Sequence, residues 1–481
     1  MSKNEFVVSM VSLLAVSGCA IIVVVPDVPE PANIEMETAF EITTLPGSDG
    51  VGAGVSFFRV RGENVAGLAF AQAQTSSNLF YEVAPDGFYV PLNEMPYSAD
   101  ESTSDICFGD GDGDGILEFI TANQHGEDNH LFQMGKADPV LTIPGGDNYH
   151  CVWADIDGDG LHEGFLFDVA GQSVVIELEG NVFGVLPPSS RFPWTQDGLP
   201  AGGGSFADVD LDGDPDLIVT SPVGVDRLYI NTGGYFQEHS AGGCDLGAEA
   251  GMSAGASLGD LDADGDADLF IARLDGADRL FRNEGGCFTR IDSPALAQET
   301  FQSWSAVWFD PDGDGDLDLA VAQYNGPILV YENSGGELRV VQRISEFNHV
   351  TAESRASGLA VFDADGDHDP DLMAAIWDGF PNIFIRNNLN HTVSGVSISA
   401  WTQNGAPLFG SQIHASAQGQ LFYRELSANE GLRSQSDPLI HLPIQPADID
   451  WLEVRYFGEV IYRSERHNIE PVVEVSYVAL E

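Results

Sequence analysis

Aspartate recurs at every second position in FDPDGDGDLDLAVA, residues 309–322, before the sequence turns apolar. Five like charges, from Asp310 to Asp318, fall within nine residues. Two carboxylates about 4–5 Å apart repel each other by roughly 3–4 kcal/mol at an effective dielectric constant of about 20. A loop that folds these side chains together therefore requires a cation between them.

The same nine-residue pattern occurs six times, with acids at its first, third, fifth and ninth positions. Several carboxylate and carbonyl oxygens in a flexible loop favour calcium over zinc, copper or magnesium. We therefore predict up to six calcium ions, each held by those four side chains and by the backbone carbonyl of the seventh residue. The predicted ligands are Asp110, Asp112, Asp114, Ile116 and Glu118; Asp155, Asp157, Asp159, Leu161 and Glu163; Asp208, Asp210, Asp212, Asp214 and Asp216; Asp260, Asp262, Asp264, Asp266 and Asp268; Asp310, Asp312, Asp314, Asp316 and Asp318; and Asp363, Asp365, Asp367, Asp369 and Asp371.

Two other interpretations of the loops are weaker. An EF-hand needs an acid at position 12 and flanking helices, but position 12 is Thr or apolar in all six loops and continues a β-type run. A merely solvated acidic turn does not explain six loops in register. Position 6 is glycine in five loops, as a turn with positive φ requires, and is His368 in the last. Glu118 and Glu163 at position 9 and His368 at position 6 therefore predict altered metal sites in these three loops.

The loops recur at intervals of 45 to 53 residues, a period typical of a β-propeller. In one repeat, the alternation and turn residues predict strands at 303–309, 319–323, 327–333 and 337–344. A seventh copy at residues 57–70 has Arg59 and Arg61 in place of the first two acids, so we expect no metal there. The last repeat lacks a fourth strand, and residues 39–46, ahead of the first repeat, resemble a fourth strand that belongs to no repeat. We expect these residues to pair into the last blade and close the ring.

The predicted fold class is all-β: a seven-bladed β-propeller of four-stranded blades, followed by a small C-terminal β domain. The predicted organisation is a leader at residues 1–25, a Pro- and acid-rich linker at 26–37, the propeller at 38–389 and the C-terminal domain at 390–481. Trp153, Trp304 and Trp308 fall on predicted inner strands, where we expect them in the core.

Composition limits the partners. The net charge of −56 argues against nucleic acid and anionic membrane surfaces. Residues 16–19, Val-Ser-Gly-Cys, fit a bacterial lipobox that would lipidate Cys19; the apolar stretch can also serve as a cleaved signal peptide or a retained membrane anchor. Each case exports the chain, as a cell-surface lipoprotein or an extracellular protein, and permits disulfides. We expect the pairs Cys107–Cys151 and Cys244–Cys287.

The D-x-D-x-D-G-x-x-D loop in a repeat of about 50 residues resembles the FG-GAP/VCBS repeat of integrin α-like propellers, in which such a loop holds one calcium ion between strands. Residues 410–463, above all RSQSDPLIHL at 433–442 and LEVRY at 452–456, resemble the ASPIC/UnbV domain. That domain follows such a propeller in cartilage acidic protein and its bacterial relatives. The resemblance implies an architecture but not a biochemical role.

No catalytic constellation is apparent in the sequence. The letters G-x-S-x-G at residues 251–255 precede a predicted strand, whereas a nucleophile elbow leads into a helix. We therefore expect a non-catalytic adhesion or ligand-binding module for an extracellular protein or glycan, with calcium as its structural ion. The alternative is a polysaccharide lyase or hydrolase built on the propeller.

Overall fold

The computed structural model describes residues 40–49, 52–59, 66–73, 77–83, 89–91, 101–239, 246–299, 301–344, 355–364, 367–377, 380–388, 395–428, 431–466 and 468–477. The chain divides into two units, Met1–Glu35 and Met36–Glu481, and every described residue belongs to the second. The predicted leader and linker, with Cys19, lie outside the described residues, as do Arg61, Cys244 and Asp365.

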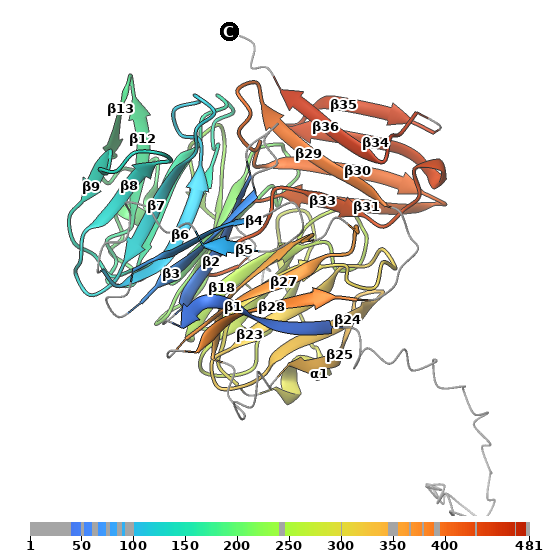
Figure 1. Ribbon diagram of the computed structural model, residues 1–481, viewed down its shortest axis with the longest axis horizontal. Helices are drawn as coiled ribbons and strands as arrows, with labels where there is room; N and C mark the ends of the chain where they lie inside the picture. The colour runs from blue at the N-terminus through green and yellow to red at the C-terminus, as the bar shows by residue number, and fades with distance from the viewer. Residues whose placement is uncertain are drawn as a thin grey trace, which may run out of the picture. The chain divides into compact units, whose positions relative to one another are not determined.

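Seven antiparallel sheets follow one another along the chain as blades 1 to 7 (Figure 1). Blade 1 contains β2 (Gly52–Arg59), β3 (Ala66–Gln72), β4 (Leu79–Val83) and β5 (Tyr89–Pro91); blade 2, β6 (Thr103–Gly109), β7 (Glu118–Asn123), β8 (Asn129–Gln133) and β9 (Leu141–Ile143); blade 3, β10 (Asn148–Ala154), β11 (Glu163–Asp168), β12 (Val174–Glu179) and β13 (Val182–Val185); and blade 4, β14 (Gly203–Ala207), β15 (Asp216–Thr220), β16 (Arg227–Ile230) and β17 (Gln237–Glu238).

The remaining blades have the same order. Blade 5 contains β18 (Ser253–Gly259), β19 (Asp268–Arg273), β20 (Arg279–Asn283) and β21 (Phe288–Ile291); blade 6, β22 (Ser303–Phe309), β23 (Asp318–Gln323), β24 (Ile328–Ser334) and β25 (Glu337–Ile344); and blade 7, β26 (Ala356–Phe362), β27 (Asp371–Ile376), β28 (Pro381–Asn387) and β1 (Phe40–Asp49). The strands of blade 6 match the predicted ones to within a residue at each end.

The ring closes as the sequence predicted. β1, from the start of the described chain, pairs antiparallel with β28, in a register that runs from Phe40 opposite Asn387 to Thr44 opposite Ile383. The first strand of each blade contacts the first strands of both neighbouring blades, from β2 round to β26 and back to β2. This closure covers the two sheet edges that an open array would expose. The chain is therefore a seven-bladed β-propeller.

The C-terminal part adds two further sheets and one short strand. Its elements are β29 (Val396–Thr402), β30 (Ser411–Ala417), β31 (Gln420–Leu426), β32 (Ser434–Gln435), β33 (Ile440–Leu442), β34 (Ile449–Tyr456), β35 (Glu459–Glu465) and β36 (Val472–Tyr477). One sheet has the order β33-β29-β36 and the other β31-β30-β34-β35, whereas β32 pairs in parallel with β2 of blade 1. Three short helices complete the described elements: η2 (Pro193–Thr195), α1 (Pro294–Gln298) and η3 (Pro446–Asp448).

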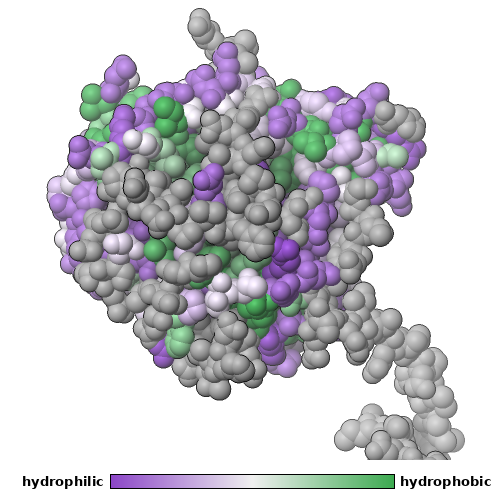
Figure 2. Space-filling view, viewed as in Figure 1, coloured by the Kyte–Doolittle hydropathy of each residue, from purple (hydrophilic) through white to green (hydrophobic). Residues whose placement is uncertain are grey.

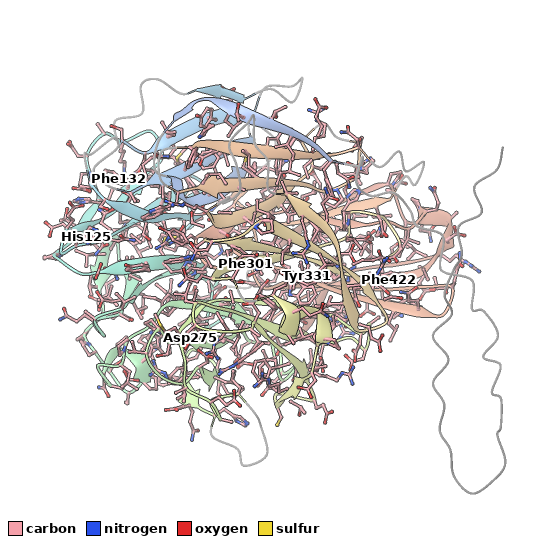
Figure 3. All side chains as sticks on the ribbon, turned by 90° about the horizontal axis from the view of Figure 1, so that it is seen from below. His125, Phe132, Asp275, Phe301, Tyr331 and Phe422 are labelled. Atoms are coloured by element: carbon pink, nitrogen blue, oxygen red, sulfur yellow. A yellow bond between two sulfur atoms is a disulfide. The ribbon has the colours of Figure 1, made fainter. Side chains whose placement is uncertain are left out.

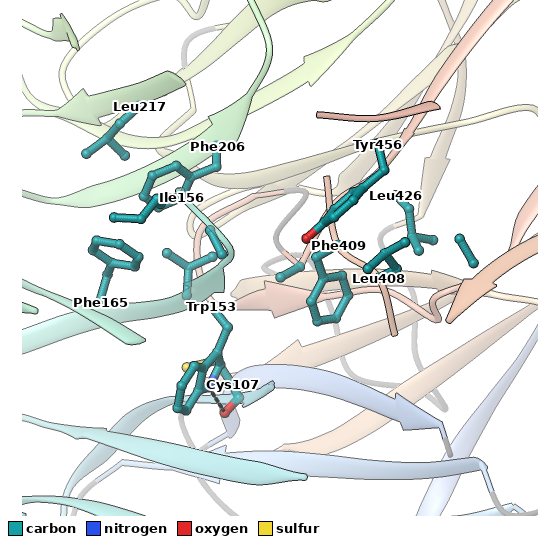
Figure 4. Packing of buried hydrophobic residues seen from close by; sticks show 14 of the residues in the cluster. Cys107, Trp153, Ile156, Phe165, Phe206, Leu217, Leu408, Phe409, Leu426 and Tyr456 are labelled. Carbon is teal, nitrogen blue, oxygen red and sulfur yellow. Dashed lines mark hydrogen bonds between the residues drawn. The ribbon is translucent and has the colours of Figure 1, made fainter. Parts of the chain in front are cut away.

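The propeller and the C-terminal sheets share a hydrophobic core. Trp153 and Phe206 of blades 3 and 4 belong to the same buried cluster as Leu408, Phe409 and Tyr456 of the C-terminal part (Figure 4). This continuity explains why Met36–Glu481 forms one compact unit.

Two of the three tryptophans expected in the core are buried there. Trp153 is 1% exposed and Trp308 is 6% exposed. The expectation was wrong for Trp304, which is only half-buried and lines a cavity. The register of β22 against β23 shifts between Ser303 and Ser305. A bulge at this place re-aims the side chain of the intervening residue, which a strict alternation does not anticipate.

The described surface in Figure 2 shows mostly hydrophilic residues, with hydrophobic residues in small groups between them. This agrees with the large excess of acidic over basic residues in the sequence. Among the described residues there is no helix that is both long and apolar enough to cross a membrane.

Candidate functional site

Each acidic loop joins the first strand of a blade to the second, and its turn is made in one way in all six. The backbone N–H of position 6 donates to Oδ2 of the position 1 aspartate, for example from Gly160 to Asp155 at 2.8 Å and from Gly315 to Asp310 at 3.0 Å. The φ angles of these two glycines are 84° and 98°. His368 makes the same bond to Asp363 at 3.1 Å with φ of 75°. The sixth loop therefore keeps the turn at some backbone strain.

The turn gathers carboxylates. In five loops, three acids each place an oxygen within 4.8 Å of the others. In blades 2, 4 and 5 the acids occupy positions 1, 3 and 9, and in blades 3 and 6 they occupy positions 1, 3 and 5. The clusters are Asp110, Asp112 and Glu118; Asp155, Asp157 and Asp159; Asp208, Asp210 and Asp216; Asp260, Asp262 and Asp268; and Asp310, Asp312 and Asp314.

Burial and like charge both act against ionisation of these groups. Burial is the largest cause that raises the pKa of Asp216 and of Asp318 to about 9. The negative charges of Asp210 and Asp312, respectively, act in the same direction. The same causes raise the pKa of Asp268 and of Glu118 to about 8, and that of Asp310 to about 7. A divalent cation among the oxygens reverses this balance because it favours the charged forms.

The donor set fits calcium. Buried Asp110 Oδ1, Asp266 Oδ1 and Asp318 Oδ2 have no hydrogen-bond partner, and buried acceptors of this kind normally have one. The clustered atoms are all oxygens, the ligands that calcium prefers. The repeated aspartate clusters are thus compatible with calcium, which would supply positive charge and fix each turn.

Some predicted ligands fall outside these clusters. Position 5 of blades 2, 4 and 5 and position 9 of blades 3 and 6 are not among the three gathered acids. In blade 7 the third-position acid, Asp365, lies outside the described residues, so that loop is described only in part. In blade 1, Arg59 replaces the first acid and forms an ion pair with Asp437 of the C-terminal part.

Sequence reasoning missed an asparagine on the third strand that ties each of four loops to the next blade. The Nδ2 of Asn333 donates to the carbonyl of Leu261, the second residue of the preceding loop, at 2.7 Å. Its backbone N–H donates to Asp318 Oδ1 at 2.7 Å. The recurrence of Asn directly after the apolar part of the third strand was the available signal. The other members are Asn231, Asn283 and Asn387.

The C-terminal part packs on the acidic loops. Gln412 donates to Asp208 Oδ2 at 2.6 Å, and the Tyr456 hydroxyl donates to Asp155 Oδ2. Arg424 donates to the carbonyl of Gly315 at 3.0 Å, and its charge acts on Asp310 and Asp260. The C-terminal sheets thus contact position 1 acids directly, so the shape of the loops determines where these sheets dock.

Residues 431–437 enter the channel of the propeller, and we call them the plug. Gln435 pairs with the backbone of Phe108, with its Oε1 accepting at 2.8 Å and its Nε2 donating at 3.1 Å. Ser434 Oγ lies 3.0 Å from Ser305 Oγ, and the Ser436 hydroxyl accepts from the N–H of Val361 at 3.0 Å. The carbonyl of Arg433 accepts from the N–H of Val55 at 3.0 Å. The plug therefore binds strands of four blades.

Small residues on the inner strands make room for the plug. A Cβ added to Gly358 would lie 2.5 Å from the carbonyl oxygen of Arg433, and one added to Gly255 would lie 2.7 Å from Cβ of Leu432. Both glycines lie five residues before the first loop position of their repeats, as Gly203 does before Asp208 and Gly54 before Arg59. Four glycines at one repeat position were a signal in the sequence for a filled channel.

The cysteines lie as follows. A disulfide joins Cys107 of β6 to Cys151 of β10, with Cα atoms 5.9 Å apart, and so links blades 2 and 3. Cys287 is disulfide-bonded, and its expected partner Cys244 lies outside the described residues. Ser253, from the G-x-S-x-G letters, begins β18 and donates to Asp226 at 2.9 Å.

The comparison with protein families agrees with the repeat. The FG-GAP-like repeat model matches residues 208–271, 260–321 and 310–374, about a third of the chain. No curated protein is similar enough to count as a match. Two solved structures are similar in part, both titled as BBS1N in complex with ARL6DN, one soaked with mercury and one with lead. Each is 13% identical and covers 73% of this chain and 96% of its own, with TM-scores of 0.47 and 0.44. Residues 208–374 of this β-propeller therefore match the FG-GAP-like repeat.

Proposed function

We propose that the chain is an exported, calcium-stabilised β-propeller that binds an extracellular protein or glycan without chemical turnover. The observation that carries this proposal is the common geometry of the acidic loops. Their carboxylates are gathered into clusters and contacted by the C-terminal sheets. Carboxylates used in this way hold a framework together and leave the remaining faces of the propeller for a ligand.

The C-terminal part would be an ASPIC/UnbV-type domain. Its most telling stretch, RSQSDPLIHL, begins in the plug and runs into β33. In this proposal the domain has a structural role: it fills the channel and covers the metal loops. The ligand then binds elsewhere on the propeller.

Export is supported by two features. The lipobox-like residues 16–19 predict a lipidated Cys19 or, failing that, another export segment. The Cys107–Cys151 disulfide fits an oxidising compartment. We place the protein at the cell surface or outside the cell, with membrane contact only through its N-terminal segment.

A binding screen with arrayed glycans and extracellular proteins tests this function, with calcium and with chelator. The account expects calcium-dependent binding of at least one class and no consumption of the bound molecule. Asp310→Asn should weaken binding together with stability, whereas Asp292→Asn, outside the loops, should change neither. Turnover of a polysaccharide, abolished by a substitution outside the acidic loops, would establish the alternative, a lyase or hydrolase.

A further inference from the structure

A cavity of about 220 Å³ lies at the end of the channel away from the acidic loops. It lies beside Arg433 of the plug and is walled by Tyr149, Trp304, Tyr324 and Trp377. Figure 3 shows His125, which also lines the cavity, and Phe422 of β31, which packs on the acidic loop at Gly315, on opposite sides of the molecule. The cavity is therefore separate from the metal loops and from the face on which the C-terminal sheets dock.

The aromatic walls come from two positions of the repeat. Tyr149 and Trp304 stand six residues before the first acids of blades 3 and 6, where β10 and β22 both shift register. Tyr324 and Trp377 stand fourteen residues after the first acids of blades 6 and 7. All four side chains are half-buried, so part of each ring remains accessible to a ligand. At the same two positions the other blades carry no aromatic residue.

Arg433 places a positive charge beside these rings, and the charge of buried Asp105 acts on it from beyond ion-pair distance. Its guanidinium carbon lies 4.6 Å from the ring centroid of Trp304, 5.0 Å from that of Tyr149 and 5.6 Å from that of Trp377. The residue is 1% exposed, and its Nη2 has no hydrogen-bond partner. Among the described residues no carboxylate lies within ion-pair distance of it. Burial lowers its pKa to about 10, so it stays charged at neutral pH.

A buried guanidinium without an ion-pair partner is costly. Asp105 offsets this cost only in part, because its carboxylate accepts from the N–H groups of Ile106 and Cys151, so an anionic ligand would offset more of it. Trp304 Nε1 is a second buried donor without an acceptor. Both groups can only donate, so a ligand group that reaches either of them must accept from it. A carboxylate does so and matches the planar fork of Arg.

The rest of the cavity favours a sugar ring beside that carboxylate. Aromatic faces offer broad apolar contact but few hydrogen-bonding groups. A peptide C-terminus would instead need backbone partners or a nest of N–H groups, whereas four of the ten lining residues are Tyr or Trp. The volume is below the roughly 300–1,000 Å³ typical of larger ligands, which suits one ring. The net charge of −56 disfavours a long polyanion and favours a single terminal acid.

We propose that this cavity binds the terminal uronic-acid residue of an acidic glycan, with its carboxylate toward the guanidinium of Arg433 and its ring against the aromatic walls. The proposal rests on the ligand-binding function above and names the class of glycan for it. Calcium plays no part in the contact itself and acts only through the framework.

The test titrates the full chain, in calcium, with free glucuronate and galacturonate against glucose, following intrinsic tryptophan fluorescence and heat. The expected result is saturable uronate binding at least about tenfold tighter than that of glucose. Trp377→Ala should weaken uronate binding about tenfold while melting temperature and bound calcium stay unchanged. The matched control is Tyr235→Ala, which removes an exposed aromatic ring far from the cavity in sequence and should leave binding intact.

Arg433→Met removes the positive charge that would face the ligand carboxylate, but it can also disturb the plug. If Arg433→Met fails to fold, Trp377→Ala decides the question. Three results would overturn the proposal: no uronate binding, equal binding of glucose, or full binding by Trp377→Ala. Binding of peptides with a free C-terminal carboxylate, but not of uronates, would assign the cavity to another ligand class. If Trp377→Ala still binds in the glycan and protein screen, the general function stands and only the cavity is ruled out as its site.

Discussion

Arg59 of blade 1 and Asp437 of the plug form an ion pair, with Nε and Oδ1 2.7 Å apart. Arg59 stands where the other six blades have the first acid of the loop. In blade 1 the positive charge of Arg59 therefore binds the plug directly. The other six blades have at this position an acid that is suited to bind a metal ion. The ion pair thus stabilises blade 1 at a position where this blade has no acid to bind a metal ion.

Breaking that pair should destabilise the folded chain. Asp437 is 9% exposed, so Arg59→Met leaves a mostly buried carboxylate without its partner. We expect a loss of about 1–3 kcal/mol in the free energy of unfolding. Denaturant titration measures it, and Arg339→Met, in an exposed pair with Glu332, should cost less than about 0.5 kcal/mol. Equal effects of the two variants would contradict the assigned role of Arg59.

Removing calcium should make stability depend on pH in an unusual direction. In the metal-free chain the pKa of Asp216 and of Asp318 is raised to about 9. A carboxyl whose folded pKa lies above its unfolded value stabilises the fold only while protonated, so this stability is lost as pH rises through the folded pKa. The melting temperature of the chelated protein should therefore rise as pH falls from 9 to 6.5.

The window ends there because buried His162 and half-buried His414 and His441 have pKa values lowered to about 4. Their contribution is lost as pH falls below the unfolded value near 6.5, which opposes the carboxylates. With calcium bound, the carboxylates are held ionised and the trend between pH 9 and 6.5 should vanish or reverse. A chelated protein that melts at the same temperature across this window would rule out the predicted shifts.

The asparagines that link neighbouring blades should contribute to the free energy of unfolding through their hydrogen bonds. Asn333 donates Nδ2 to Leu261 and Leu317 carbonyls and accepts from the N–H of Gly336. Asn333→Ala should therefore cost about 2–4 kcal/mol in the free energy of unfolding, because it leaves buried groups unpaired. Asn325→Ala, which removes an exposed bond to Gln302, serves as control and should be nearly neutral. A neutral Asn333→Ala would show that the link between blades is dispensable.

Filling the channel should displace the plug. In Gly358→Ala the new methyl group would lie 2.5 Å from the Arg433 carbonyl oxygen, so backbone must move. We expect a lower melting temperature and faster proteolysis within residues 427–439. Gly184→Ala, on the outer strand β13 with open space around it, is the matched control. Slow proteolysis in both variants would indicate that the plug does not depend on this fit.

Much of the fold follows from local pattern. The repeat period, the alternation within each blade and the closure by β1 all depend on short-range signals, and the blade 6 strands lie where the alternation placed them. The turn at positions 1 and 6 follows from the glycine there, and His368 adopts the same turn.

What the pattern did not show arises between distant parts of the chain. Tyr456 reaches Asp155, and Gln435 reaches Phe108, across hundreds of residues. No local periodicity records such contacts. The glycines facing the plug and the aromatic pairs of the cavity were visible as repeat positions, but their meaning depended on what fills the channel. Trp304 was misplaced because one bulged residue reverses the face that alternation predicts.

The most direct test of the account is calcium stoichiometry together with the melting temperature, with and without chelator. The account predicts five or six bound ions, one for each of the five described clusters and one for the loop at Asp363, and a large fall in melting temperature on chelation. One bound ion or none, with an unchanged melting temperature, would mean that the loops are solvated acidic turns and that calcium does not hold this propeller together.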